Sequence, residues 1–386
     1  MRKVAIVGLG QTPVREHWDS NLRDLAVTAL RDAMEDAGVE TLDGVTVGNM
    51  LSGALSEQEH LGALVADYAG LEGVEGMKIE AACGSGAAAI RMAVKAVASG
   101  LMDTVGVVGV EKLTEFSGKF STASLAYAAD ADYEIMMGLS FVGINALLMR
   151  RYLHEYKYDK NDFSIFPVNA HKNAIHNPNA MFRHPITDAQ YAKSKIIADP
   201  INLLDSSPIA DGAAAVIVVA QENISQYAGK PVSILACEVG TDTLALDTRE
   251  NPLWLKGTER SAKKAYYVSG LKPKDMDFFE VHDAFSIMTA LSLEASGFTE
   301  KGTAIKFAEK TGIDIKGKLP LTTAGGLKGR GHPVGATGVY QVVEAAKQIR
   351  GTMPPEIQLD KNRVAMAQNI GGSGATVITT ILKKIV

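Results

Sequence analysis

Short apolar runs alternate along the chain with segments whose apolar residues recur every three or four positions. The run KVAIVG at residues 3–8 has the pattern of a buried strand. From Leu22 onward, a helical face is predicted that Gly38 ends, because apolar residues stand at positions 22, 25, 26, 29, 30, 33, 34 and 37. The stretch GVTVGNM at 44–50 is strand-like again. This alternation predicts a largely parallel sheet with helices on both faces.

The same order of elements occurs twice. ACGSGAAAIRMAVKAVASG at 82–100 indicates a tight turn entering a helix, and a strand-like run, DTVGVVGVE, follows it. GHPVGATGVYQVVEAAKQI at 331–349 repeats this arrangement and is followed by NRVAMAQN. A duplicated α/β unit is therefore expected, with halves at 1–230 and 231–386. The segment from about 120 to 195 has no counterpart in the second half and is interpreted as an inserted cap or loop region.

Composition and the N-terminus exclude several classes of protein. The 386 residues are 46% apolar and 22% charged with a net charge of −5, which fits a well-packed α/β protein and offers no nucleic-acid surface. No apolar run reaches the roughly 20 residues needed to span a bilayer. The opening MRKVAIVGLGQTPV is too short in its apolar part for a signal peptide, and two cysteines give no disulfide framework, so a cytoplasmic location is expected. Pro13 stands where a dinucleotide loop needs its third glycine, which argues against a nicotinamide cofactor.

Cys83 stands directly before a predicted helix, among small residues that let another backbone approach closely. A thiol at a helix N-terminus faces unpaired N–H groups and the positive end of the helix dipole, which favour the thiolate. A small buried cysteine would suit the same surroundings, since free cysteines are usually buried packing residues. Cys83 is therefore a candidate nucleophile, with a packing role as the alternative.

Two histidines occupy comparable positions. His332 precedes Pro333, a residue suited to the first helical turn, so the imidazole is expected at a helix N-terminus, where the dipole keeps it neutral and able to take a proton from a thiol. A satisfied turn histidine is the alternative. His282 follows the strand-like DFFEV and precedes an apolar helical stretch. With Cys83, both lie where a strand gives way to a helix, the edge of an α/β sheet at which ligands bind, and the three form a candidate nucleophile–base set.

The remaining candidates are assigned structural roles. Cys237 alternates like a core strand residue, and Asp283 is expected to cap the helix that it opens. The other histidines lack the spacing of a zinc site or lie in polar, surface-like stretches; they are His17, His60, His154, His171, His176 and His184.

Four motifs in this order resemble the thiolase superfamily: ACGSG, HDAF, GHPVGATG and the closing NIGGSG. The resemblance is greatest to the sterol-carrier-type thiolases and their archaeal acetyl-CoA C-acetyltransferase relatives. It covers nearly the whole chain and includes NAHKNAIHNPNAMFR at 169–183. The resemblance implies a five-layered α/β/α/β/α fold built from two duplicated halves, assembled as a homodimer or a dimer of dimers.

The resemblance also implies residue roles. Cys83 would accept an acyl group from acyl-CoA, and His332 would activate Cys83 and help to hold the thioester oxygen of the second substrate. His282 stands where many thiolases have asparagine and would support that same oxyanion site. The peptide N–H groups of Cys83 and Gly371 would form a second oxyanion hole, for the carbonyl of the acyl-enzyme. Losing one such donor typically costs roughly 3–4 kcal/mol of transition-state stabilisation.

One feature departs from the family pattern. Most thiolases carry a second cysteine that removes the α-proton of acetyl-CoA and later returns it. At the two positions where that cysteine occurs in the family, this sequence has Ala284 and Asn369. With Cys237 expected in a core strand, His282 is the best remaining candidate for the acid/base.

The implied reaction joins two acetyl-CoA molecules into acetoacetyl-CoA and CoA through a Cys83 acyl-enzyme, or runs in reverse as thiolysis. CoA thioesters are then the substrates, no metal or organic cofactor is needed, and Lys328 and Arg330 beside His332 are candidates for the CoA phosphates, although charges there would equally suit a solvated face. Alternatives are a decarboxylating ketoacyl synthase, whose H-G-T-G-T pattern is absent, a hydroxymethylglutaryl-CoA synthase-like enzyme, and a non-condensing acyl carrier or scaffold. The family further implies the isoprenoid (mevalonate) pathway, with hydroxymethylglutaryl-CoA synthase and a small zinc-ribbon/OB-fold protein as partners.

Overall fold

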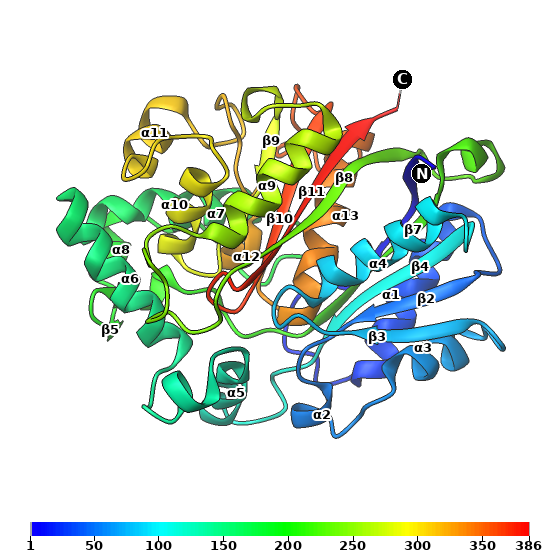
Figure 1. Cartoon of the computed structure of the whole chain (residues 1–386), viewed down its shortest axis with the longest axis horizontal. Helices are drawn as coiled ribbons and strands as arrows, with labels where there is room; N and C mark the ends of the chain where they lie inside the picture. The colour runs from blue at the N-terminus through cyan, green and yellow to red at the C-terminus, as the bar shows by residue number, and fades with distance from the viewer. Residues whose placement is uncertain (1, 386) are drawn as a thin grey trace.

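The computed structural model describes residues 2–385, and most of their strands join one nine-stranded mixed sheet (Figure 1). The strand order is β3-β2-β4-β7-β1-β8-β11-β10-β9. These strands are β1 (Val4–Gln11), β2 (Gly44–Gly48), β3 (Glu75–Ile79), β4 (Thr104–Glu111), β7 (Gly212–Ala220), β8 (Val232–Thr241), β9 (Phe278–Glu280), β10 (Val364–Gly371) and β11 (Thr376–Lys384). A separate two-stranded ladder pairs β5 (Ile196–Ala198) with β6 (Ile201–Asn202).

The expectation of a largely parallel sheet is wrong. Only β2 with β3, β2 with β4, and β9 with β10 pair in parallel, whereas the other five pairs are antiparallel. The apolar pattern records burial of both sheet faces, and an antiparallel strand that is covered on both faces has the same pattern as a parallel one.

The strand order confirms the duplication. The run β2-β4-β7-β1 in the first half corresponds to β9-β10-β11-β8 in the second, and the two runs meet where β1 pairs with β8. Helices α1 (Leu22–Ala37) and α9 (Lys256–Ser269) occupy equivalent places, as do α4 (Ser85–Ser99) and α13 (Thr337–Arg350). The predicted division at residue 230 lies in the loop before β8, and that the halves are separate domains stays a prediction.

Three apolar clusters separate five layers. Along β1, Val4 and Ile6 face the middle cluster, which contains α4 and α13, while Ala5 and Val7 face the cluster beneath α1 and α3 (Leu61–Ala69). The third cluster packs α9 and α10 (Ser286–Ala295) against the strands of the second half. Figure 1 shows α4 and α13 between the strands of the two halves. This is the five-layered α/β/α/β/α arrangement that the sequence predicted.

Helix α1 begins and ends as its apolar pattern predicted, and Gly38 closes it with a φ of 68°. The segment between β4 and β7 is mainly helical rather than a loop, with α5 (Gly118–Leu125), α6 (Phe141–Tyr156), α7 (Ile165–Ala174) and α8 (Asp188–Ala192). We call residues 118–202 the cap. The short or peripheral helices are α2 (Ser52–Leu55), α11 (Ala304–Thr311) and α12 (Gly326–Gly329).

The structure also overturns the expected position of one histidine. His17 was expected at the surface, but it is buried, with Nε2 2.8 Å from the carbonyl oxygen of Pro13. Within residues 2–385, no helix combines the length and apolar character that crossing a membrane requires.

Candidate active site

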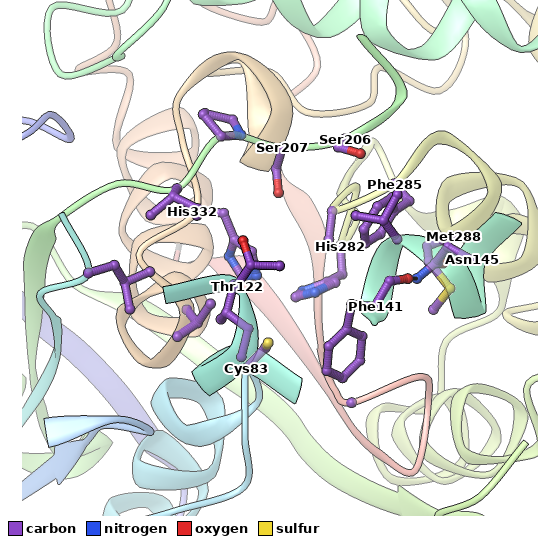
Figure 2. A pocket seen from close by; sticks show the side chains of 18 residues that line it. Cys83, Thr122, Phe141, Asn145, Ser206, Ser207, His282, Phe285, Met288 and His332 are labelled. Atoms are coloured by element: carbon purple, nitrogen blue, oxygen red, sulfur yellow. Dashed lines mark hydrogen bonds between the residues drawn. The ribbon is translucent and has the colours of Figure 1, made fainter. Parts of the chain in front are cut away.

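One cavity of about 200 Å³ opens between the central helices and the cap. Figure 2 shows Cys83, His282 and His332 arranged around this space. The structure therefore brings together the three residues that the sequence proposed as a nucleophile–base set. The rest of the wall is mainly apolar and is formed by Leu113, Thr122, Leu125, Phe141, Val142, Asn145, Ser206, Ser207, Pro208, Ile209, Ala284, Phe285, Met288, Val334 and Gly372.

Cys83 lies in a tight turn between β3 and α4. Ala82, directly before it, has a positive φ of 51°, a costly conformation for a residue with a Cβ. Ser85 stabilises this turn, because its hydroxyl donates to the carbonyl of Ala82 at 2.6 Å and accepts from the N–H of Ala81 at 2.9 Å. Helix α4 begins at Ser85, so the half-buried Cys83 lies just before its N-terminus, as expected.

The thiol of Cys83 does not ionise by itself. Burial raises its pKa to about 12, and the nearby Glu111 carboxylate acts in the same direction. Hydrogen bonds from the peptide N–H groups of Cys83 and Gly372 oppose this rise without cancelling it. The N–H groups near this helix end thus favour the thiolate as expected, but burial outweighs them and keeps the pKa of the thiol high. Cys83 needs a base to take its proton.

Two neighbouring glycines form the loop opposite Cys83. The amide that reaches the sulfur belongs to Gly372, one residue beyond the predicted donor Gly371. A Cβ on Gly371 would lie 2.3 Å from the carbonyl oxygen of Ala81, so glycine is needed there for the loop to approach the Cys83 turn. A donor role for Gly371 itself stays a prediction.

The ring of His282 is neutral and carries its proton on Nε2. Its Nδ1 accepts a hydrogen bond from the peptide N–H of Ile370 at 3.3 Å, and the Asn369 amide lies 3.1 Å from the same atom. Because a peptide N–H can only donate, Nδ1 holds a lone pair and the proton is assigned to Nε2, the nitrogen left for the cavity. Burial, assisted by Arg330, lowers the pKa of His282 to about 3. His282 can therefore donate a hydrogen bond to an oxyanion, and the expectation that it replaces the second cysteine as a base is not supported.

The ring of His332 has the opposite arrangement. Its Nδ1 lies 2.6 Å from the hydroxyl of Thr337, which donates its proton to the carbonyl oxygen of Pro333 at 3.2 Å. The hydroxyl oxygen then accepts from Nδ1–H, so Nε2 is assigned a free lone pair. Burial, with the neighbouring His282 and Arg330, holds the pKa of His332 well below its usual value. His332 is therefore a neutral base.

The two imidazole rings lie 5.2 Å apart, centroid to centroid, and are nearly perpendicular at 89°. His332 lies directly before Pro333, the N-cap of a 3₁₀ turn at Val334–Ala336 that leads into α13 at Thr337, so it is next to a helix N-terminus as expected. It follows the short helix α12, however, and the expectation that a strand precedes it is wrong. The first residue of α13 nevertheless orients the ring by accepting from Nδ1–H.

Glu111 supports this site and was missed by the sequence analysis. It ends β4, is fully buried, and accepts hydrogen bonds from the N–H of Gly335, the N–H of Met50 and the side-chain amide of Asn49, each at 2.9 Å. Burial raises the pKa of its carboxyl to about 7. The contact with Gly335 ties the loop of His332 to the first half of the chain. The available signal was a glutamate closing a strand of small apolar residues, GVVGVE.

Neither predicted phosphate-binding cation is open to solvent. Arg330 is fully buried, pairs with Glu344 at 2.9 Å, and lies 4.8 Å over the ring of Tyr340. Lys328 is 4% exposed and donates to the carbonyl of Ser206 at 2.7 Å, and burial lowers its pKa to about 8. The structure thus assigns both to packing and gives no support to their contact with CoA phosphates.

The other positions that the sequence singled out are also placed. Ala284 lines the cavity, whereas Cys237 is buried in β8, 3.4 Å from the Thr380 hydroxyl, so Cys83 is the only thiol at the cavity. Asp283 does not cap α10 as expected. Its carboxylate accepts from the N–H groups of Leu327 and Lys328, in the first turn of α12.

Known proteins match this chain over nearly its whole length. The thiolase N-terminal domain family matches residues 4–222, and the thiolase C-terminal domain-like family matches residues 239–384. An acetyl-CoA acetyltransferase of Methanothermobacter thermautotrophicus is 40% identical over 386 residues, covering 100% of both chains. Human sterol carrier protein 2 is 28% identical, with 98% of this chain and 72% of that protein covered. The solved structure of the Ltp2-ChsH2(DUF35) aldolase has a TM-score of 0.87 at 26% identity, covering 99% of this chain and 98% of the other.

These similarities confirm the predicted family and fold class. The matched families span both halves of the chain, and the relatives include the archaeal and sterol-carrier types that the motifs indicated. The chain therefore belongs to the thiolase family and is an acyltransferase of that family.

Proposed function

We propose that this enzyme transfers an acetyl group between CoA thioesters, joining two acetyl-CoA molecules into acetoacetyl-CoA and CoA or running the reverse thiolysis. The observation that carries the proposal is the meeting of Cys83, the free Nε2 of His332 and the Nε2–H of His282 at one cavity. The archaeal relative that is 40% identical is named an acetyl-CoA acetyltransferase, which supports acetyl-CoA as the substrate.

The first half-reaction acylates Cys83. Nε2 of His332 takes the thiol proton while the sulfur attacks the thioester carbonyl, because a thiol with a pKa near 12 would rarely ionise beforehand. The carbonyl oxygen carries negative charge in this step, and the peptide N–H groups of Cys83 and Gly372 are the candidate donors to it. The bond to the CoA sulfur then breaks, and His332 returns the proton to the departing CoA thiolate.

Partners and assembly extend the proposal. The similar solved structure pairs Ltp2 with ChsH2, a DUF35 protein, which supports a DUF35-type partner for this enzyme. A homodimer or dimer of dimers, and a functional link to hydroxymethylglutaryl-CoA synthase, follow from the family resemblance.

A second candidate activity is aldol cleavage of a 3-hydroxyacyl-CoA. The observation that favours it is Ala284, which leaves the cavity without a second thiol, together with the similarity to an aldolase structure. In that reaction His332 would take the hydroxyl proton as the Cα–Cβ bond breaks, releasing an aldehyde or ketone. His282 would hold the thioester enolate until His332 protonates its α-carbon. Cys83 forms no bond in this sequence.

The deciding experiment is a thiolysis assay with acetoacetyl-CoA and CoA, with intact-mass analysis of the acylated protein. Wild type should release acetyl-CoA and gain one acetyl group, whereas Cys83→Ala should do neither. Cys237→Ala is the matched control, since that thiol is buried in β8, and it should behave like wild type. Absence of acylation in the wild type would refute the acetyltransferase proposal. Cleavage of a 3-hydroxyacyl-CoA that survives in Cys83→Ala would establish the aldolase instead.

A further inference from the structure

The cavity presents only one group able to act as a base. Besides Cys83 and the two histidines, its polar side chains are those of Thr122, Asn145, Ser206 and Ser207. Hydroxyl and amide groups hold no proton-accepting lone pair of useful basicity at neutral pH, and no carboxylate or lysine lines the cavity. The proton of the second acetyl-CoA must therefore be removed by a histidine or by the Cys83 sulfur, which is already acylated at that stage.

The hydrogen bonds around the histidines decide between them. Nδ1 of His282 is engaged by the Ile370 N–H, so its Nε2 carries a proton and cannot accept another. Nδ1 of His332 instead donates to the Thr337 hydroxyl, whose own proton goes to the carbonyl of Pro333, and this leaves Nε2 as the acceptor. Two adjacent rings thus have opposite tautomers fixed by two different partners.

We propose that His332 is the sole acid–base group of both half-reactions and that His282 acts only as a hydrogen-bond donor to the thioester oxygen. This inference rests on the acetyltransferase function proposed above. It explains how the chain does without the second thiol that Ala284 and Asn369 fail to supply.

Proton balance permits one base to serve twice. In the first half-reaction His332 receives the Cys83 proton and gives it to the departing CoA thiolate, so Nε2 is free again when the acyl-enzyme has formed. A second acetyl-CoA then binds with its thioester oxygen on Nε2–H of His282, and His332 removes a proton from the methyl carbon. The electron pair of that C–H bond forms the enolate, whose negative oxygen His282 stabilises.

The second half-reaction then closes the cycle. The enolate carbon attacks the acetyl carbonyl on Cys83, a C–C bond forms, and the bond from that carbon to the Cys83 sulfur breaks. The sulfur leaves as a thiolate and takes back the proton held by His332. Every proton that His332 accepts is released within the same half-reaction, so no second acid–base group is required.

The placement of the rings suits this division of roles. The two perpendicular rings lie 5.2 Å apart, centroid to centroid, and both line the cavity. A thioester oxygen and its α-carbon are attached to the same carbonyl carbon. A substrate whose thioester oxygen is bound to His282 therefore holds its α-protons close to the neighbouring His332.

The test isolates proton removal from acylation. In a Cys83→Ala background no acyl-enzyme forms, and exchange of the methyl protons of acetyl-CoA for deuterium in D₂O reports enolisation alone, followed by mass spectrometry. Adding His332→Asn should lower the exchange rate by about 10²- to 10⁴-fold, the usual contribution of a general base. Adding His282→Gln, which keeps an N–H donor, should lower it much less. His171→Gln is the matched control, because that buried histidine contacts the His184 carbonyl and does not line the cavity.

A folding control guards against simple loss of structure. The Cys83→Ala/His332→Asn protein should keep the circular dichroism spectrum and the urea midpoint of the Cys83→Ala parent. The assignment would be overturned if His332→Asn left the exchange rate unchanged, or if His282→Gln lowered that rate as much as His332→Asn does. Failure of the proposed function looks different: the wild type would not become acylated by acetyl-CoA, even though exchange in the Cys83→Ala protein still depended on His332.

Discussion

Replacing Gly86 by alanine tests whether the close packing of α4 against the His332 loop sets the catalytic geometry. A Cβ at Gly86 would lie 2.7 Å from the carbonyl oxygen of Gly335 and 3.0 Å from the backbone nitrogen of Val339, whereas ordinary contacts begin at 3.4 Å. Both obstacles are backbone atoms, so neither can rotate away as a side chain would. The helix that follows Cys83 and the loop that follows His332 must then move apart.

The expected magnitudes follow from this geometry. Relieving the shorter contact requires a separation of about 0.7 Å, and overpacking of this kind typically costs about 1–3 kcal/mol of unfolding free energy. The better helix propensity of alanine returns about 1 kcal/mol, which leaves a net loss of up to about 2 kcal/mol. The rate is more sensitive, because a misplacement of about 1 Å can cost about 10²-fold. We expect kcat for thiolysis to fall by roughly 10- to 100-fold.

The assay pairs urea unfolding with steady-state thiolysis of acetoacetyl-CoA, for Gly86→Ala and Gly143→Ala. Gly143 lies in the first turn of α6, as Gly86 does in α4. A Cβ at Gly143 would meet no atom closer than the Ser140 hydroxyl oxygen, at 3.6 Å. The control should keep the wild-type rate and gain up to about 1 kcal/mol of unfolding free energy from the helix propensity of alanine. If Gly86→Ala matched the control in both, the reasoning from backbone contact would be refuted.

Three further outcomes are expected. In urea titrations between pH 7.5 and pH 5, wild type should lose about 2 kcal/mol of unfolding free energy relative to His282→Gln. The His282 imidazole gains a proton below about pH 6.5 in the unfolded chain but not in the folded one, where its pKa is about 3, so an equal pH dependence of the two proteins would contradict this. Arg249 is buried and donates at 2.7 Å to the carbonyl of Ser373, within the turn that carries the Gly372 amide. Arg249→Met should therefore slow iodoacetamide alkylation of Cys83 several-fold and shift the pH profile of alkylation upward, whereas an unchanged profile would show that the turn keeps its position without Arg249. Arg330→Met should cost about 3–5 kcal/mol of unfolding free energy by leaving Glu344 without its partner, yet leave the KM for CoA unchanged; a raised KM would restore Arg330 as a phosphate ligand.

The sequence predicted those parts of the site that depend on local pattern. The glycine-flanked junction around Cys83 is readable because a strand, a turn and a helix follow one another within a few residues, whereas His332 follows the short helix α12 and no strand precedes it. The bounds of α1 were equally clear, since its apolar period and its closing Gly38 are both local.

Features that depend on distant contacts were not predictable. Which histidine can accept a proton depends on the hydrogen-bond partner of its Nδ1 atom. For His282 that partner is the peptide N–H of Ile370, eighty-eight positions along the chain. The burial of Arg330 depends on Glu344 lying beside it once α13 has packed, and charged residues are exposed in most folds. Whether neighbouring strands pair in parallel or antiparallel likewise depends on the direction in which β7 and β11 run through the sheet, and the apolar pattern does not contain that direction.

The facing helices α4 and α13 carry a further consequence for the origin of the enzyme. They are equivalent elements of the two copies, but the thiol precedes one and the imidazole precedes the other. Two identical copies assembled around the same axis would present a pair of thiols or a pair of imidazoles, and neither pair combines a nucleophile with its base. Pairing the nucleophile with its base therefore requires that the two copies differ, so the asymmetry of a few side chains, and not the shape of the scaffold, separates a working catalyst from a repeated architecture.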